Sequence, residues 1–166
     1  MPPTTLETAA DLESAFVTWN RLLFQYVFAR LRQREVAEDL VQEVFFKAWR
    51  SRESFNAEKS SLKNWLFAIT INAIRDYFRT KKPESEILTE DLASTQEVAR
   101  EVGDKDLVRF VFKKVKKLPE RDQELILLRY NQGLNVIEIA DIVGMEYSAT
   151  KVALHRAIKK LKTLCE

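Results

Sequence analysis

The sequence has little of the residue types that build disulfide scaffolds, metal sites and turn-rich folds. Its 166 residues include one cysteine (Cys165), one histidine (His155), three glycines and four prolines. A single cysteine excludes an internal disulfide and a cysteine-based zinc site, and a single histidine provides no cluster for a metal or a catalytic relay. The low content of glycine and proline disfavours turn-rich all-β folds and favours helices.

Features of membrane proteins and enzymes are also missing. No apolar run approaches the roughly 18 residues of a membrane span, and the first residues, MPPTTLETAADLE, lack the basic and apolar parts of a secretion signal. There is no glycine-rich phosphate loop and no catalytic spacing of carboxylates, histidines or cysteines. Because 46% of the residues are apolar, the chain can form hydrophobic cores. We expect a cytoplasmic, all-α protein that uses no cofactor, binds no metal and is not an enzyme.

Charge divides the chain into three segments. Residues 1–82 carry 13 basic and 10 acidic side chains, residues 83–106 carry 2 and 8, and residues 107–166 carry 12 and 7. The net charge of +2 therefore hides two basic halves joined by an acidic stretch. We predict two small helical domains, 1–82 and 107–166, and an acidic linker over 83–106. Within this linker, Ser94 and Glu97 form a capping-box pattern that favours the start of a short helix.

The first domain is predicted to be a helical bundle. Apolar periodicity predicts helices over residues 12–31, about 35–49, and from 60 or 61 to about 81. The residues expected to face the core are Leu12, Phe16, Trp19, Leu23, Tyr26 and Val27 in the first helix, Val41, Val44, Phe45 and Ala48 in the second, and Leu62, Leu66, Ile69, Ala73 and Tyr77 in the third.

Two faces of this bundle are candidate binding surfaces. On the second helix, an acidic patch surrounds an aromatic residue and consists of Asp39, Gln42, Glu43 and Phe46. Such a patch suits a basic protein partner. On the third helix, a basic, polar and aromatic set consists of Trp65, Asn72, Arg75, Asp76 and Arg79. Such a set suits single-stranded nucleic acid. For both faces, the alternative is a solvated helix surface with its aromatic side chain turned toward the core.

The C-terminal half has the pattern of a helix-turn-helix motif. A helix over 120–131 is expected to stop at Gly133, and Asn135 with Glu138 forms a capping box that begins a helix over 136–143. Gly144 then breaks the chain, and Ser148 is predicted to cap a last helix from 149 to about 162. A glycine-containing turn between two helices is typical of DNA-binding helix-turn-helix domains.

The last helix has an apolar and a basic side. Its inward residues are Thr150, Leu154, Ala157, Ile158 and Leu161, and its outward residues are Lys151, His155, Arg156, Lys159 and Lys162. Lysine and arginine on such a helix can donate to guanine edges and phosphates in the major groove. The same pattern occurs on ordinary protein surfaces. Because His155 lies in the middle of this helix, a DNA contact is favoured over a catalytic role.

Two pairs of sequence blocks resemble a known family. AEDLVQEVFFKAWR and FNAEKSSLKNWLFAITINAIRDYFRTKK resemble region 2 of bacterial sigma factors of the extracytoplasmic-function (ECF) group of the sigma-70 family. LPERDQELILLRYNQGLNVIEIADIVG and SATKVALHRAIKKLK resemble region 4 of the same group. The resemblance implies a sigma factor, monomeric when free, that binds core RNA polymerase, directs promoter-specific initiation and is held inactive by an anti-sigma factor.

The resemblance also implies a role for individual residues. Docking on the clamp helices of the polymerase largest subunit is implied for Asp39, Leu40, Gln42, Glu43 and Phe46. Binding of the non-template strand of the minus-ten element is implied for Trp65, Asn72, Arg75, Asp76 and Arg79. Contact with the minus-thirty-five element is implied for Lys151, Val152, His155, Arg156 and Lys159. Val152 stands where the family commonly has a polar or basic side chain, so this helix has fewer base-edge donors.

Two other classes of function fit parts of the pattern. One is a dimeric helix-turn-helix repressor, which would need a symmetric interface and palindromic half-sites. It leaves the acidic patch of the second helix without a role. The other is a sigma-like adaptor that binds only proteins, for which the basic side of the last helix would be unimportant.

Overall fold

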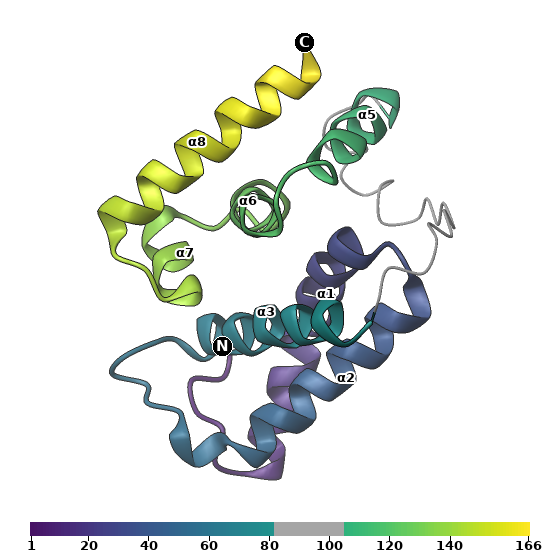
Figure 1. The fold of residues 1–166 in the computed structure, drawn as a ribbon. Coiled ribbons are helices and arrows are strands. Elements are labelled where there is room, and N and C mark those ends of the chain that lie inside the picture. The colour runs from purple at the N-terminus through teal and green to yellow at the C-terminus, as the bar shows by residue number, and fades with distance from the viewer. Residues whose placement is uncertain (82–104) are drawn as a thin grey trace. The chain divides into compact units, whose positions relative to one another are not determined.

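The computed structural model describes residues 1–81 and 105–166, in which all regular structure is helical. The described residues form two compact units, one built around α1, α2 and α3 and the other around α5, α6 and α8 (Figure 1). The all-α fold class is therefore confirmed. Most of the predicted linker, including Ser94 and Glu97, lies outside the described residues, and α5 begins at Lys105. No described helix combines the length and the apolar character needed to cross a bilayer.

The first unit is a bundle of three helices that pack against one another. They are α1 (Ala9–Leu31), α2 (Arg34–Arg50) and α3 (Leu62–Thr80), and the short 3₁₀ turn η1 (Arg52–Ser54) follows α2. All three predicted helices are thus confirmed. Tyr26 of α1 and Phe67 of α3 are both fully buried and meet edge to face, with ring centroids 6.0 Å apart. Long-range aromatic packing of this kind joins the first helix to the third.

Side-chain caps determine where two of these helices begin. Thr8 caps α1 through a reciprocal pair of bonds with Asp11, 3.2 Å and 2.9 Å long. The backbone N–H groups of Thr8 and Glu7 donate to the Asp11 carboxylate and hold its pKa below its usual value. Of the two serines predicted to cap α3, Ser61 does so, accepting a bond of 3.1 Å from the backbone of Asn64.

The buried side of α3 differs from the predicted stripe. Leu62, Leu66 and Ala73 are buried as expected, but Ile69 and Tyr77 are only partly buried. The side chains that are buried instead are Phe67, Thr70, Ile71 and Ile74. Because α3 packs against both α1 and α2, its covered face is wider than a single four-residue stripe and is rotated away from Ile69.

The described residues from 105 onward form four helices. They are α5 (Lys105–Val115), α6 (Glu120–Ile126), α7 (Val136–Val143) and α8 (Tyr147–Cys165), and α6 continues as one π-helical segment over Leu127–Asn131. Helices α5 and α6 pack against α8, and a salt bridge of 2.8 Å joins Lys160 of α8 to Asp122 of α6. The core contains the fully buried side chains of Leu125, Leu128, Ile139 and Ala157. The helix α5 is not anticipated by the sequence pattern.

The predicted helix-turn-helix is present over α7 and α8. Asn135 and Glu138 exchange two hydrogen bonds of 2.9 Å and 3.0 Å, so the predicted capping box is confirmed. Gly133 and Gly144 adopt left-handed backbone conformations with φ of 68° and 70°, as the helix ends require. The predicted cap at Ser148 is wrong. The chain is extended at Glu146 and already helical at Tyr147, so Ser148 lies inside the first turn of α8.

We predict that Asn135→Ala destabilises the second unit. The substitution removes the side-chain oxygen that accepts the Glu138 N–H, and losing such a cap costs about 1 kcal/mol. The free energy of unfolding, measured in urea, should fall by that amount. The matched control is Ser148→Ala, which removes a hydroxyl that caps nothing and should change stability by less than about 0.5 kcal/mol. Equal losses in the two variants would contradict this assignment of the caps.

Two adjacent phenylalanines of α2 should respond very differently to truncation. Phe45 is 5% exposed and Phe46 is 59% exposed. We predict that Phe45→Ala lowers the free energy of unfolding by about 3–5 kcal/mol because it leaves a cavity. Phe46→Ala should lower it by less than about 1 kcal/mol because the side chain is largely in water. Thermal and denaturant unfolding of the full chain would check both values, and a large loss for Phe46→Ala would show that it belongs to the core.

Candidate functional site

The acidic face of α2 consists of Asp39, Gln42, Glu43 and Phe46, all of which are exposed. The opposite side of the helix buries Val41, Val44, Phe45 and Ala48, as predicted. Helical periodicity therefore brings the two carboxylates and the Phe46 ring to the same outward side. This arrangement is the predicted patch, and its aromatic side chain is in solvent.

Two cations limit the charge of this face at its C-terminal end. Lys47 forms an ion pair of 2.8 Å with Glu43, and the guanidinium of Arg50 lies 5.5 Å from the centre of the Phe46 ring. Because Lys47 partly neutralises Glu43, the N-terminal end of the face, at Asp39, is more negative than its C-terminal end. Leu40 is placed differently from the other residues of this set, since it is only 7% exposed and packs into the core. It supports the face from inside and offers almost no surface.

An open groove beside the acidic face was not anticipated. It is lined by Ala9, Leu12, Glu13 and Phe16 of α1 and by Gln42, Phe45, Phe46 and Trp49 of α2. The prediction that Phe16 faces the core is wrong, because its ring is 41% exposed and packs edge-on against Phe45, with centroids 5.1 Å apart. Phe16 lines the groove and is only partly covered by α2. The spacing of residues 9, 12, 13 and 16, which places them along one side of α1, was the sequence signal that could have indicated this groove.

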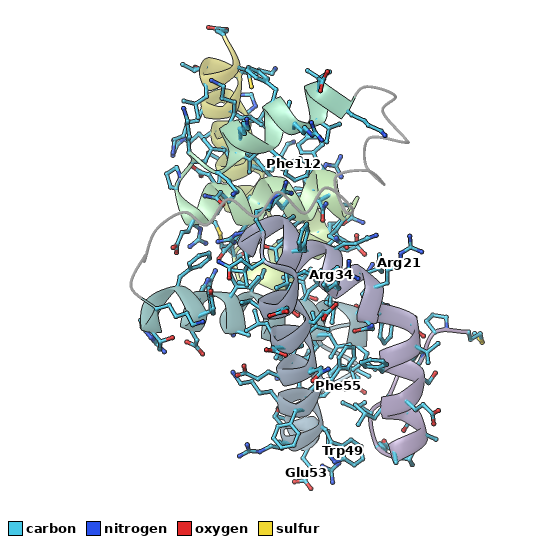
Figure 2. All side chains as sticks on the ribbon, turned by 90° about the vertical axis from the view of Figure 1, so that its right-hand side faces the viewer. Arg21, Arg34, Trp49, Glu53, Phe55 and Phe112 are labelled. Atoms are coloured by element: carbon cyan, nitrogen blue, oxygen red, sulfur yellow. The ribbon has the colours of Figure 1, made fainter. Side chains whose placement is uncertain are left out.

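Trp65 begins the candidate nucleic-acid face of α3. Its indole is half-buried, and the ring of Phe55 from the preceding loop lies 5.2 Å away at a tilt of 46°. Figure 2 labels Phe55 and, nearer the end of α2, Trp49 and Glu53. Arg52 covers the ring of Trp49 at 4.0 Å and donates to its carbonyl oxygen. The loop thus holds aromatic surface next to the start of α3.

The remaining residues of this face follow Trp65 along one side of α3. Asn72, Arg75 and Arg79 are exposed, and Asp76 is half-buried. At about 100° per residue, these positions and Trp65 fall within about one-third of the helix circumference. Asp76 and Arg79 form an ion pair of 2.7 Å, which orients the guanidinium while leaving most of its surface in water. The five predicted residues therefore share one surface of polar, cationic and aromatic character.

The outward face of α8 carries the third set. Lys151, Val152, His155, Arg156 and Lys159 are all exposed, whereas Thr150, Leu154 and Ala157 are buried against the rest of the unit. Ile158 and Leu161, predicted to face inward, are half-buried. Thr150 donates to the carbonyl oxygen of Glu146 at 2.9 Å and satisfies its hydroxyl within the first turn. Within residues 1–81 and 105–166 there is no group of three or more side chains able to hold a metal ion.

Comparison with known proteins supports the same division of the chain. Residues 16–84 match the family model of Sigma-70 region 2, and residues 113–161 match that of Sigma-70, region 4. The ECF RNA polymerase sigma-E factor of Haemophilus influenzae is 34% identical over 149 residues, covering 82% of this chain and 75% of that protein. The RNA polymerase sigma factor SigZ of Bacillus subtilis is 30% identical over 156 residues, covering 94% and 88%.

The fold also has a counterpart among solved structures. The sigma factor RpoE in complex with the anti-sigma factor NepR from Bartonella quintana superposes with a TM-score of 0.67. The match covers 95% of this chain and 98% of that one at 24% sequence identity, so it supports the fold alone. Region 2 corresponds to the bundle of α1–α3, and region 4 corresponds to the unit that contains the helix-turn-helix. The chain therefore belongs to the ECF group of the sigma-70 family, whose members direct promoter-specific transcription initiation by RNA polymerase.

Proposed function

We propose that the chain binds core RNA polymerase through the acidic face of α2. The observation that carries the proposal is the 59% exposure of Phe46 on the same side of α2 as the carboxylates of Asp39 and Glu43. An aromatic ring in water gains free energy when a partner buries it, and the carboxylates select a basic partner surface. The family resemblance, which implies docking of this segment on the clamp helices of the polymerase largest subunit, supports the proposal. Leu40 contributes by packing beneath the face.

The α3 face then holds one DNA strand. Single strands are bound by stacking of bases on aromatic rings and by cations along the phosphates. Trp65 with Phe55 offers the aromatic surface, and Arg75 and Arg79 offer the cations on the same side of α3. In this proposal the face takes the non-template strand of the minus-ten element, with Asn72 and Asp76 as the polar groups that read a flipped base.

The outward face of α8 contacts the minus-thirty-five element as duplex DNA. The second helix of a helix-turn-helix lies in the major groove, and the N-terminal residues of that helix reach the base edges. Lys151, Val152 and His155 lie in the first half of α8, whereas Arg156 and Lys159 continue toward its C-terminus. We assign base contacts to the first group and phosphate contacts to the second.

The proposal has consequences for partners and location. Sigma factors are DNA-binding regulators rather than enzymes. We place the chain in the cytoplasm with the polymerase, as a monomer when free, and we expect an anti-sigma factor that covers its binding faces. A dimeric repressor remains the second class of function, but it gives the acidic face of α2 no role. A protein-only adaptor gives the basic face of α8 none.

The first experiment is binding of the chain to purified core RNA polymerase without DNA. We predict that Asp39→Arg/Glu43→Arg weakens binding by roughly tenfold or more, because like charges would then meet across the interface. The matched control is Glu53→Arg/Glu58→Arg, which makes the same change in net charge at two exposed residues of the loop after α2. Failure of the folded, unmodified chain to bind the polymerase would contradict the proposal and favour the repressor.

The second experiment separates a promoter-binding subunit from an adaptor. We predict that Lys151→Glu/Arg156→Glu abolishes transcription from promoters of this chain's holoenzyme while leaving polymerase binding unchanged. Each lost phosphate contact should also reduce the slope of log affinity against log salt by about 1. The control Lys113→Glu/Lys117→Glu reverses two exposed lysines elsewhere in the unit. Normal transcription by the Lys151→Glu/Arg156→Glu variant would support the adaptor.

A further inference from the structure

Val152 is an apolar side chain at the centre of the outward face of α8. It is 48% exposed, whereas Thr150, Leu154 and Ala157 of the same helix are buried. At about 100° per residue, Val152 lies almost opposite the mean direction of these three buried side chains. Val152 therefore lies on the side of α8 that would approach a bound ligand most closely.

The neighbours of Val152 on this face are polar or cationic. Ser148, His155, Arg156 and Lys159 all lie within about 60° of it around the helix axis, and all are exposed. These side chains suit phosphates and base-edge acceptors, and Val152 can neither donate nor accept a hydrogen bond. A ligand that matches the whole face must present negative charge at the edges and an apolar group in the middle.

In the major groove only one base supplies an apolar group. Thymine carries a C5-methyl group at the groove surface, and none of the other three bases has a methyl group there. Val152 lies in the second turn of α8, in the N-terminal part that contacts base edges in this class of domain. Its β-branched side chain has one strongly preferred rotamer in a helix, so little conformational freedom is lost on contact.

We propose that Val152 contacts the C5-methyl group of a thymine in the upstream promoter element, and so makes this base part of the recognised sequence. The proposal rests on the proposed function and adds a ligand atom to it. A position that lacks a hydrogen-bonding side chain then reads sequence by apolar contact. Arg156 and Lys159 position the helix on the phosphates and discriminate little between bases.

The test uses the full chain in complex with core RNA polymerase. Duplexes randomised over the upstream element are selected for binding, and each thymine of the selected sequence is then replaced singly by deoxyuridine, which removes only the methyl group. Affinity is measured for the unmodified chain and for Val152→Ala. At one thymine, deoxyuridine should weaken binding by the unmodified chain roughly fourfold, the value of one buried methyl group.

At that base, the losses of affinity caused by Val152→Ala and by deoxyuridine should not be additive. Val152→Ala should weaken binding to thymine DNA roughly threefold to tenfold, and deoxyuridine should then have no further effect. The control Leu107→Ala truncates another half-exposed apolar side chain of the same unit, on α5, and should retain the full deoxyuridine effect. Independent, multiplying effects of Val152→Ala and deoxyuridine, or an upstream sequence without thymine, would overturn the proposal. Selection of no sequence at all would contradict the proposed function itself.

Discussion

The burial of one side of α2 against α1 and α3 is the constraint on which the exposed acidic face of the first unit depends. Four side chains of α2, from Val41 to Ala48, are at most 5% exposed. Once they are buried, helical periodicity leaves Asp39, Glu43 and Phe46 no position except the outward side. The backbone that carries the exposed Phe46 ring is thus fixed by the burial of its neighbour Phe45.

The same constraint acts on α8 with the opposite charge. Thr150, Leu154 and Ala157 bury the inward side of this helix, and the Lys160–Asp122 salt bridge joins it to α6 at its edge. The lysines and the arginine of the outward side are then exposed and available to a ligand. An acidic face around an aromatic ring suits a protein, and a basic face around a small apolar side chain suits duplex DNA.

Local ion pairs modify what the charge counts suggest. Glu43 is paired with Lys47, so the α2 face presents less negative charge than its carboxylates carry formally, and Asp76 is paired with Arg79 within the α3 face. Exposed pairs of this kind contribute at most about 1 kcal/mol to stability. Their larger effect is on the orientation of the side chains, because a paired carboxylate orients its partner cation. In α3 this leaves the guanidinium of Arg79 beside the polar side chains of the candidate nucleic-acid face.

The all-α fold, the two-unit grouping and the described helices other than α5 were predictable from the sequence. Apolar periodicity and the Asn135–Glu138 capping box are local signals, because their partners lie within four residues along the chain. The Asp39–Phe46 and Lys151–Lys159 faces also follow from periodicity, once the motif resemblance gives them a role. The cap at Ser148 could not be predicted reliably, since Ser148 carries a capping side chain but the chain enters α8 two residues earlier.

Tertiary structure decided how far each side chain is covered. The sequence alone determined that Phe16, Ile69 and Tyr77 lie on helices, and their apolar character suggested burial. Whether they are covered depends on helices that come from distant parts of the chain. Phe16 lines an open groove, and α3 turns Phe67, Ile71 and Ile74 inward in place of Ile69. Periodicity gives the direction of a side chain around its own helix, but only packing determines which direction is the inside.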